Sequence, residues 1–238
     1  AGAPENCVQW ITQPSMEATT ALMNHEGIAT ILATGGNAMV KAAYSCGKPA
    51  LGVGAGNVPA YVEESANIRQ AAHDIVMSKS FDNGMVCASE QAVIIDKEIY
   101  DEFVEEFKSY HTYFVNKKEK ALLEEFCFGA KANSKNCAGA KLNPNIVGKS
   151  AVWIAEQAGF TVPEDTNILA AECKEVGEKE PLTREKLSPV IAVLKSEDTE
   201  DGLKKARQMV EFNGLGHSAA IHTKDETLAK RFGTEIKA

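Results

Sequence analysis

The 238-residue sequence lacks long hydrophobic runs, an excess of basic residues and a signal-like leader. No apolar stretch approaches the roughly 18 residues that a membrane-spanning helix needs. Lysine and arginine total 25 against 33 aspartates and glutamates, which gives a formal net charge of −8. An acidic chain without a basic stripe argues against nucleic acid as a partner. We therefore expect a cytoplasmic protein that binds neither a membrane nor nucleic acid.

Paired cysteine motifs are also missing. None of the six cysteines forms a C-x-x-C pair, and no histidine lies at zinc-ligand spacing from one of them. Their scatter indicates reduced thiols and not a disulfide framework, and we expect no metal site. A free cysteine is most often a small buried residue. The six are Cys7, Cys46, Cys87, Cys127, Cys137 and Cys173.

Cys87 stands apart from the other cysteines by its position. It lies in the segment FDNGMVCASEQ, after a helix-like stretch and before a strand-like one. A side chain at such an edge can meet a substrate, and neighbouring backbone N–H groups stabilise a thiolate. No histidine lies beside it in sequence, so a cysteine–histidine pair would have to be assembled by the fold. From the residues alone, Cys87 is either a nucleophile or a small buried side chain.

Strand-like and helix-like segments alternate along the chain, which predicts an α/β fold with a parallel sheet and right-handed crossovers. The lysine-rich segment 117–120 is expected to be a solvated turn. Apolar and β-branched runs predict strands at 27–32, 50–53, 59–62, 91–95, 168–171, 189–194 and 218–222. Apolar residues at three- and four-residue spacing, with caps, predict helices at 37–46, 67–79, 151–158, 199–212 and 226–236 and one shortly after Asp96.

Two glycine clusters are candidates for holding a nucleotide. The segment GVGAGN at 52–57 fails the G-x-G-x-x-G fingerprint, because the last glycine is missing and a strand follows. Gly35 and Gly36 are better placed, since they open a predicted helix whose free N–H groups can face an anion. A glycine turn before a helix is equally common as a plain turn.

Four ordered segments carry a resemblance to a known family. They are ATGGNAMVKAAYSCGKPALGVGAGNVPAYV, MSKSFDNGMVCASEQAVI, REKLSPVIAV and GLGHSAAIHT. Together they resemble the CoA-acylating aldehyde dehydrogenases, and the similarity covers essentially the whole chain. The resemblance implies an aldehyde dehydrogenase fold that is partial. Residues 1–61 would be the C-terminal part of a Rossmann-like dinucleotide-binding domain, and residues 62–238 an α/β catalytic domain lacking its end.

The resemblance also implies roles for particular residues. Cys87 corresponds to the catalytic cysteine of the family. Gly36 and Gly54 match positions that line NAD, and Glu185 in REKLSP matches the glutamate of E-x-F-G-P that holds the nicotinamide ribose. His217 in GLGH would polarise the acyl oxygen or contact CoA, with a structural role as the alternative.

The implied reaction interconverts acetaldehyde, CoA and NAD with acetyl-CoA and NADH through a cysteine thioester, in fermentative alcohol metabolism. Hydrolytic members of the fold carry a glutamate in L-E-L-G-G-K that activates water. The aligned segment here places Val53 at that position and contains no carboxylate, so the thioester is expected to survive until CoA attacks it.

The chain begins without methionine, and relative to the family we expect a fragment that is inactive alone. In bifunctional members an iron-dependent alcohol dehydrogenase domain follows, so any iron would belong to that separate domain. The implied partners are acetaldehyde or acetyl-CoA, CoA, and further copies of the chain in a homo-oligomer that could form a filament. The alternatives are a monofunctional acylating aldehyde or semialdehyde dehydrogenase, and a non-catalytic scaffold segment of such a filament.

Overall fold

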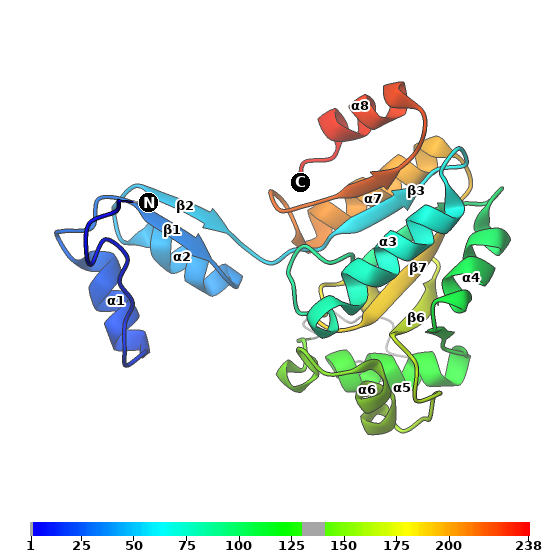
Figure 1. Cartoon of the computed structure of the whole chain (residues 1–238), viewed down its shortest axis with the longest axis horizontal. Coiled ribbons are helices and arrows are strands. Elements are labelled where there is room, and N and C mark those ends of the chain that lie inside the picture. Colours follow the sequence, from blue (N-terminus) through cyan, green and yellow to red (C-terminus); the bar gives the residue numbers. More distant parts are fainter. Residues whose placement is uncertain (1, 130–140) are drawn as a thin grey trace. The chain divides into compact units, whose positions relative to one another are not determined.

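The computed structural model describes residues 2–129 and 141–238, which form two compact units, Ala1–Gly54 and Ala55–Ala238 (Figure 1). Both units are α/β, which confirms the predicted fold class. The units divide after Gly54, and the predicted boundary residue Tyr61 lies inside strand β3 (Pro59–Val62) of the second unit. Tyr61 pairs with Ile94 and Ile221 in the sheet of the second unit. Its backbone groups therefore have their hydrogen-bond partners in that unit.

The first unit is small and contains one two-stranded parallel sheet. Its elements are α1 (Met16–Asn24), β1 (Ile31–Thr34), α2 (Asn37–Ser45) and β2 (Ala50–Val53). Ile31, Ala33 and Ala43 are its buried hydrophobic residues, and α1 buries none. Helix α2 begins at Asn37, directly after its cap residue Gly36. The unit therefore has little apolar burial to stabilise it.

The second unit is built on a six-stranded sheet in the order β5-β6-β7-β4-β3-β8, with every pair parallel. Strands β3, β4 and β6 are buried almost throughout, as expected of a parallel sheet covered on both faces. After β3, the strands are β4 (Ala92–Asp96), β5 (Thr112–Phe114), β6 (Ile168–Cys173), β7 (Val190–Ser196) and β8 (Ala220–His222).

Helices cover both faces of this sheet. Side chains of α3 (Ile68–Ser80) and α4 (Tyr100–Ser109) pack with Val93 and Ile95 of β4 in one core. The opposite core holds Ala92 and Ile94, because successive strand residues point to opposite faces. The helices on that side are α5 (Lys117–Phe128), α6 (Ala151–Ala158), α7 (Thr199–Asn213) and α8 (Glu226–Glu235). Three short helices, η1 (Phe81–Gly84), η2 (Pro144–Ile146) and η3 (Pro181–Thr183), lie in the connections.

The lysine-rich segment is the first turn of α5 and not a solvated turn. Asn116 caps this helix, and Glu119 closes the capping box by accepting a hydrogen bond from the Asn116 N–H. The side chain of Lys120 is only 20% exposed. A capping residue followed by charged residues is typical of a helix start as well as of a turn. The buried residues later in α5, which pack in the core, stabilise the helix here.

None of the helices in the described part of the chain is long and apolar enough to cross a bilayer. Five cysteines in the described part are free thiols, whereas Cys137 lies outside it. Cys127 and Cys173 are buried, as expected for small apolar side chains, but Cys7 and Cys87 are exposed.

Candidate functional site

Three predicted site residues and Gly56 lie on the four loops that enter β7, β4, β3 and β8. Glu185 precedes β7, Cys87 precedes β4, Gly56 precedes β3 and His217 precedes β8. These strands are parallel and consecutive in the sheet, so the loops before them meet at one edge. Ligands of doubly wound sheets usually bind outside the carboxyl ends of the strands. Here the candidate residues gather at the amino ends instead.

Gly56 lies at the centre of this group. Its N–H donates a hydrogen bond of 2.9 Å to Oε1 of Glu185. A Cβ atom on Gly56 would come within 2.6 Å of the Cys87 carbonyl oxygen and 3.0 Å of two carbons of the His217 ring. The fold thus brings together Cys87, Glu185 and His217, which are far apart in sequence. Gly56 was missed in the sequence analysis, although three glycines at alternate positions in GVGAGN signalled a close backbone approach.

The loop that carries Cys87 is a tight turn at the end of α3. Asp82 and Asn83 adopt φ 50°, and Gly84 adopts φ 68°. A Cβ on Gly84 would lie 2.5 Å from the Ser188 carbonyl oxygen, so glycine is required there for both reasons. The next turn is closed by the N–H of Ser89, which donates to the Val86 carbonyl over 2.9 Å. This turn leaves Cys87 exposed, as a nucleophile must be.

Glu185 and His217 are both partly buried and have polar partners. Burial raises the pKa of the Glu185 carboxyl, while the Gly56 N–H, His217, Lys186 and Lys79 act in the opposite direction. Nδ1 of His217 lies 3.1 Å from the Ser218 hydroxyl, and the side chain is half-buried. The carboxylate is thus a hydrogen-bond acceptor held at the edge of the site.

Beneath the loops lie three buried polar residues that the sequence analysis did not single out. Lys79, Gln91 and Lys186 are each 0% exposed. Nζ of Lys79 donates to Oε1 of Gln91 over 3.3 Å, and the same oxygen accepts from the Lys186 N–H over 3.0 Å. One signal was present: Lys79 continues the apolar series Ala72, Ile75 on the buried face of α3.

Gly36 and Gly54 lie in the first unit, at the start of α2. Gly36 caps this helix without a side-chain hydrogen bond, and nothing lies within 4 Å of a Cβ placed on it. A Cβ on Gly54 would lie 2.8 Å from Oδ1 of Asn37, the first residue of α2. The two glycines therefore leave the free N–H groups of the helix open, a suitable cradle for a diphosphate.

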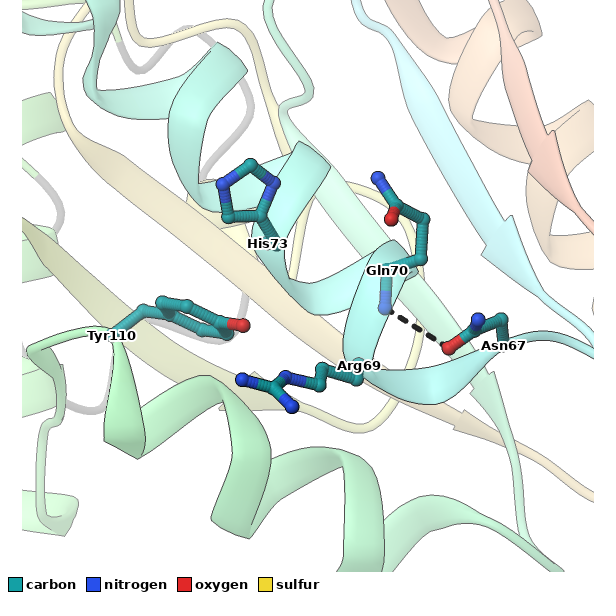
Figure 2. Close-up of a pocket in the computed structure, with 5 residues that line it drawn as sticks. All are labelled: Asn67, Arg69, Gln70, His73 and Tyr110. Atoms are coloured by element: carbon teal, nitrogen blue, oxygen red, sulfur yellow. Dashed lines mark hydrogen bonds between the residues drawn. The ribbon is translucent and has the colours of Figure 1, made fainter.

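A surface cavity lies away from these loops. It measures about 280 Å³ and is lined by Asn67, Arg69, Gln70, His73 and Tyr110 (Figure 2). It surrounds the start of α3, whereas Cys87 follows its end, and the 13 residues between span about 20 Å. No cysteine, serine or threonine is among its described lining residues. Among the described residues, no group of three or more histidine, cysteine or acidic side chains could hold a metal ion.

Comparisons with known proteins identify relatives of the chain. The chain is 91% identical over its whole length to the aldehyde-alcohol dehydrogenase of Streptococcus pneumoniae, of which it spans 27%. A crystal structure of an acetylating aldehyde dehydrogenase from Geobacillus thermoglucosidasius matches with a TM-score of 0.90 and 44% identity, covering 100% of this chain and 50% of that one.

Another solved structure adds chemical detail about a relative. It is a propionaldehyde dehydrogenase of Rhodopseudomonas palustris with bound CoA and an acylated cysteine. It matches with a TM-score of 0.82 and 31% identity, covering 95% of this chain and 49% of that one.

The family comparison settles where the chain belongs. Residues 1–238 match the aldehyde dehydrogenase family, which confirms the resemblance found in the four sequence segments. The chain is a member of the aldehyde dehydrogenase family.

Proposed function

We propose that the chain supplies the reacting cysteine of a CoA-acylating aldehyde dehydrogenase. The enzyme would interconvert acetaldehyde, CoA and NAD with acetyl-CoA and NADH through a Cys87 thioester. The observation that carries the proposal is the exposed Cys87 beside Gly56, Glu185 and His217 at one edge of the sheet. The acetylating activity and the acylated cysteine named for two relatives support it.

Cys87 provides covalent catalysis in this proposal. Its sulfur adds to the aldehyde carbonyl carbon and forms a thiohemiacetal, whose oxygen carries the developing negative charge. The Cys87 N–H and the His217 ring would stabilise that oxygen. The chemistry that NAD would supply when bound is that of a hydride acceptor. The thioester left on Cys87 is then attacked by the thiol of CoA, which releases acetyl-CoA and frees Cys87.

The resemblance to the family assigns cofactor contacts to residues in each of the two units. The N–H groups at the start of α2, left open by Gly36 and Gly54, would bind the diphosphate of NAD. The Glu185 carboxylate would accept hydrogen bonds from the ribose hydroxyls. Val53, the last residue of β2, offers no carboxylate to activate water, which favours transfer of the acyl group to CoA over hydrolysis.

Further parts of the proposal concern the protein in the cell. We infer a cytoplasmic homo-oligomer, with any iron confined to a separate alcohol dehydrogenase domain. A scaffold role without catalysis is the second candidate, since relatives several times longer contain this segment. The two are separated by the reactivity of Cys87.

The test uses the gene product that carries this chain, incubated with acetyl-CoA without NADH and digested for mass spectrometry. We expect an acetyl group on the Cys87 peptide, released as acetyl-CoA when CoA is added back. Cys87→Ser should lose the adduct and CoA-dependent aldehyde oxidation, because the covalent path is gone. Cys7→Ser, which alters the other thiol that is exposed among the described residues, should keep both. An unlabelled Cys87 in active enzyme would refute the assignment.

A further inference from the structure

Lys186 follows Glu185 directly, yet its side chain points into the protein. It is 0% exposed, and its Nζ donates to the carbonyl oxygens of Gln91, Leu182 and Arg184 over 3.0, 2.6 and 2.6 Å. A lysine ammonium has three donors, so all three are used. All three acceptors are backbone carbonyls. Burial lowers the pKa of Lys186 to about 7, because a buried ammonium is costly to desolvate. This cost indicates a role other than stability.

These three hydrogen bonds restrain the loop around Glu185. Leu182 and Arg184 lie on its N-terminal side in the same loop, whereas Gln91 belongs to the segment that enters β4. The Lys186 N–H adds a fourth bond, of 3.0 Å, to Oε1 of Gln91. The residue after Glu185 is thus fixed both to its own loop and to the neighbouring strand.

Gln91 extends this network to the other site loops. Its Nε2 donates to the Ser89 carbonyl over 3.1 Å, two residues after Cys87. Its backbone N–H donates to the Val58 carbonyl over 2.8 Å, two residues after Gly56. Gln91 and Lys186 together therefore connect the loops that carry Glu185, Cys87 and Gly56.

We propose that Lys186 is a positioning residue, which holds the Glu185 carboxylate on the Gly56 N–H through its bonds to Gln91, Leu182 and Arg184. This inference rests on the proposed function, in which Glu185 binds the ribose of NAD. Lys186 itself contacts neither cofactor nor substrate. Its loss should therefore weaken NAD binding through Glu185 and leave the acyl transfer from acetyl-CoA to Cys87, which needs no NAD, largely intact.

The first measurement compares two readouts in the gene product that carries this chain. We expect Lys186→Met to raise KM for NAD about 10-fold, less than the roughly 100-fold that a 1 Å misplacement of a reacting group can cost. Acetylation of Cys87 by acetyl-CoA should stay within about 3-fold of the unchanged enzyme. Lys174→Met, which alters an exposed lysine of the same connection, should change neither. Equal losses in both readouts would overturn the proposal, because they indicate a general structural defect.

A double-mutant cycle shows whether Lys186 acts through Glu185. Adding Lys186→Met to Glu185→Gln should raise KM for NAD no further than Glu185→Gln alone. Effects that multiply would overturn the proposal. If Lys186→Met does not fold, Lys186→Gln, which leaves Gln91 and its bond to Ser89 in place, enters the same cycle. Failure of the unchanged enzyme to acetylate Cys87 would instead refute the proposed function, and this inference with it.

Discussion

At the scale of single residues, Gly56 shows how a missing side chain can organise a site. The carbonyl of Cys87 and the ring of His217 occupy the space that a methyl group would need, at 2.6 and 3.0 Å. The N–H of the same residue holds Glu185. A substitution here must displace at least one of the two loops, and the Cys87 contact is to backbone, which cannot rotate away.

We expect Gly56→Ala to slow acetylation of Cys87 by acetyl-CoA about 10- to 100-fold, because the loop carrying the sulfur is displaced. The measurement is the rate of adduct formation by quenched-flow mass spectrometry. Gly233→Ala is the matched control, since a Cβ there meets nothing within 4 Å and the residue lies inside helix α8. An unaltered acetylation rate in Gly56→Ala would contradict the contacts described here.

Glu185 gives a prediction of pH dependence. Burial raises the pKa of its carboxyl above the ordinary value, so the group takes up a proton at a higher pH than an exposed glutamate. Only the ionised form accepts hydrogen bonds with both oxygens. We expect KM for NAD to rise as the pH falls towards the raised pKa of this carboxyl. In Glu185→Gln this change should disappear; if it persists, another group is responsible.

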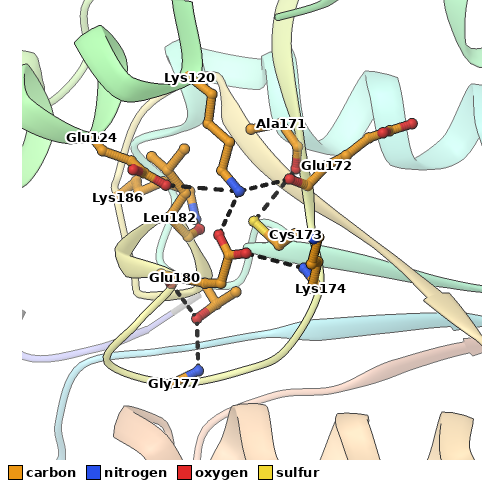
Figure 3. Close-up of polar contacts among 11 residues, drawn as sticks. Lys120, Glu124, Ala171, Glu172, Cys173, Lys174, Gly177, Glu180, Leu182 and Lys186 are labelled. Atoms are coloured by element: carbon orange, nitrogen blue, oxygen red, sulfur yellow. Dashed lines mark hydrogen bonds and ion pairs between the residues drawn. The ribbon is translucent and has the colours of Figure 1, made fainter. Parts of the chain in front are cut away.

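At the scale of elements, α5 is tied to the connection between β6 and β7. Nζ of Lys120 donates to the Glu172 carbonyl over 2.8 Å and pairs with Oε2 of Glu180, and Oε1 of Glu180 accepts from the Lys174 N–H (Figure 3). The connection is also closed by Thr183, whose hydroxyl accepts from the Gly177 N–H. This connection leads to Glu185, so a helix on one face supports the site loop.

Lys120→Met should destabilise the second unit by about 1–3 kcal/mol, because it leaves the mostly buried Glu180 carboxylate without its cation. Chemical denaturation followed by circular dichroism measures the change. Lys230→Met provides the comparison, since its pair with Glu226 is 4.0 Å long and exposed on both sides. That variant should differ by less than about 0.5 kcal/mol. Equal losses of unfolding free energy in the two variants would show that the contacts of Lys120 with Glu172 and Glu180 do not stabilise the unit.

At the scale of the whole molecule, the two units differ in what stabilises them. Residues 55–238 contain both cores that sandwich the six-stranded sheet. Residues 1–54 bury three hydrophobic side chains around two strands. Two strands alone are marginal in water, and a chain this short buries only a modest share of its surface.

Expressed separately, residues 55–238 should unfold cooperatively, whereas residues 1–54 should give the poorly dispersed amide spectrum of an unfolded chain in nuclear magnetic resonance. The reason is that conformational entropy scales with length and only the second unit buries enough apolar surface to offset it. A well-dispersed spectrum from residues 1–54 would show that this unit needs no additional chain.

Much of the fold and part of the site could be predicted from the sequence. Local patterns located β2, β3 and α6 at their observed bounds, because apolar period and caps act over a few residues. The segment around Cys87 and the four family motifs identified the nucleophile candidate and the family. Helix α1, with no buried residue, left no periodic signal and was missed.

Only the tertiary structure decided which loops share an edge. The order β7-β4-β3-β8 depends on pairings between strands up to more than a hundred residues apart, and no local pattern encodes such a pairing. It is this order that places Gly56 between Cys87, His217 and Glu185. The burial of Lys79 and Lys186 was also decided by the tertiary structure, because a lysine side chain is usually exposed. Only the folded chain brings their acceptors, the side-chain oxygen and the backbone carbonyl of Gln91, next to the two ammonium groups.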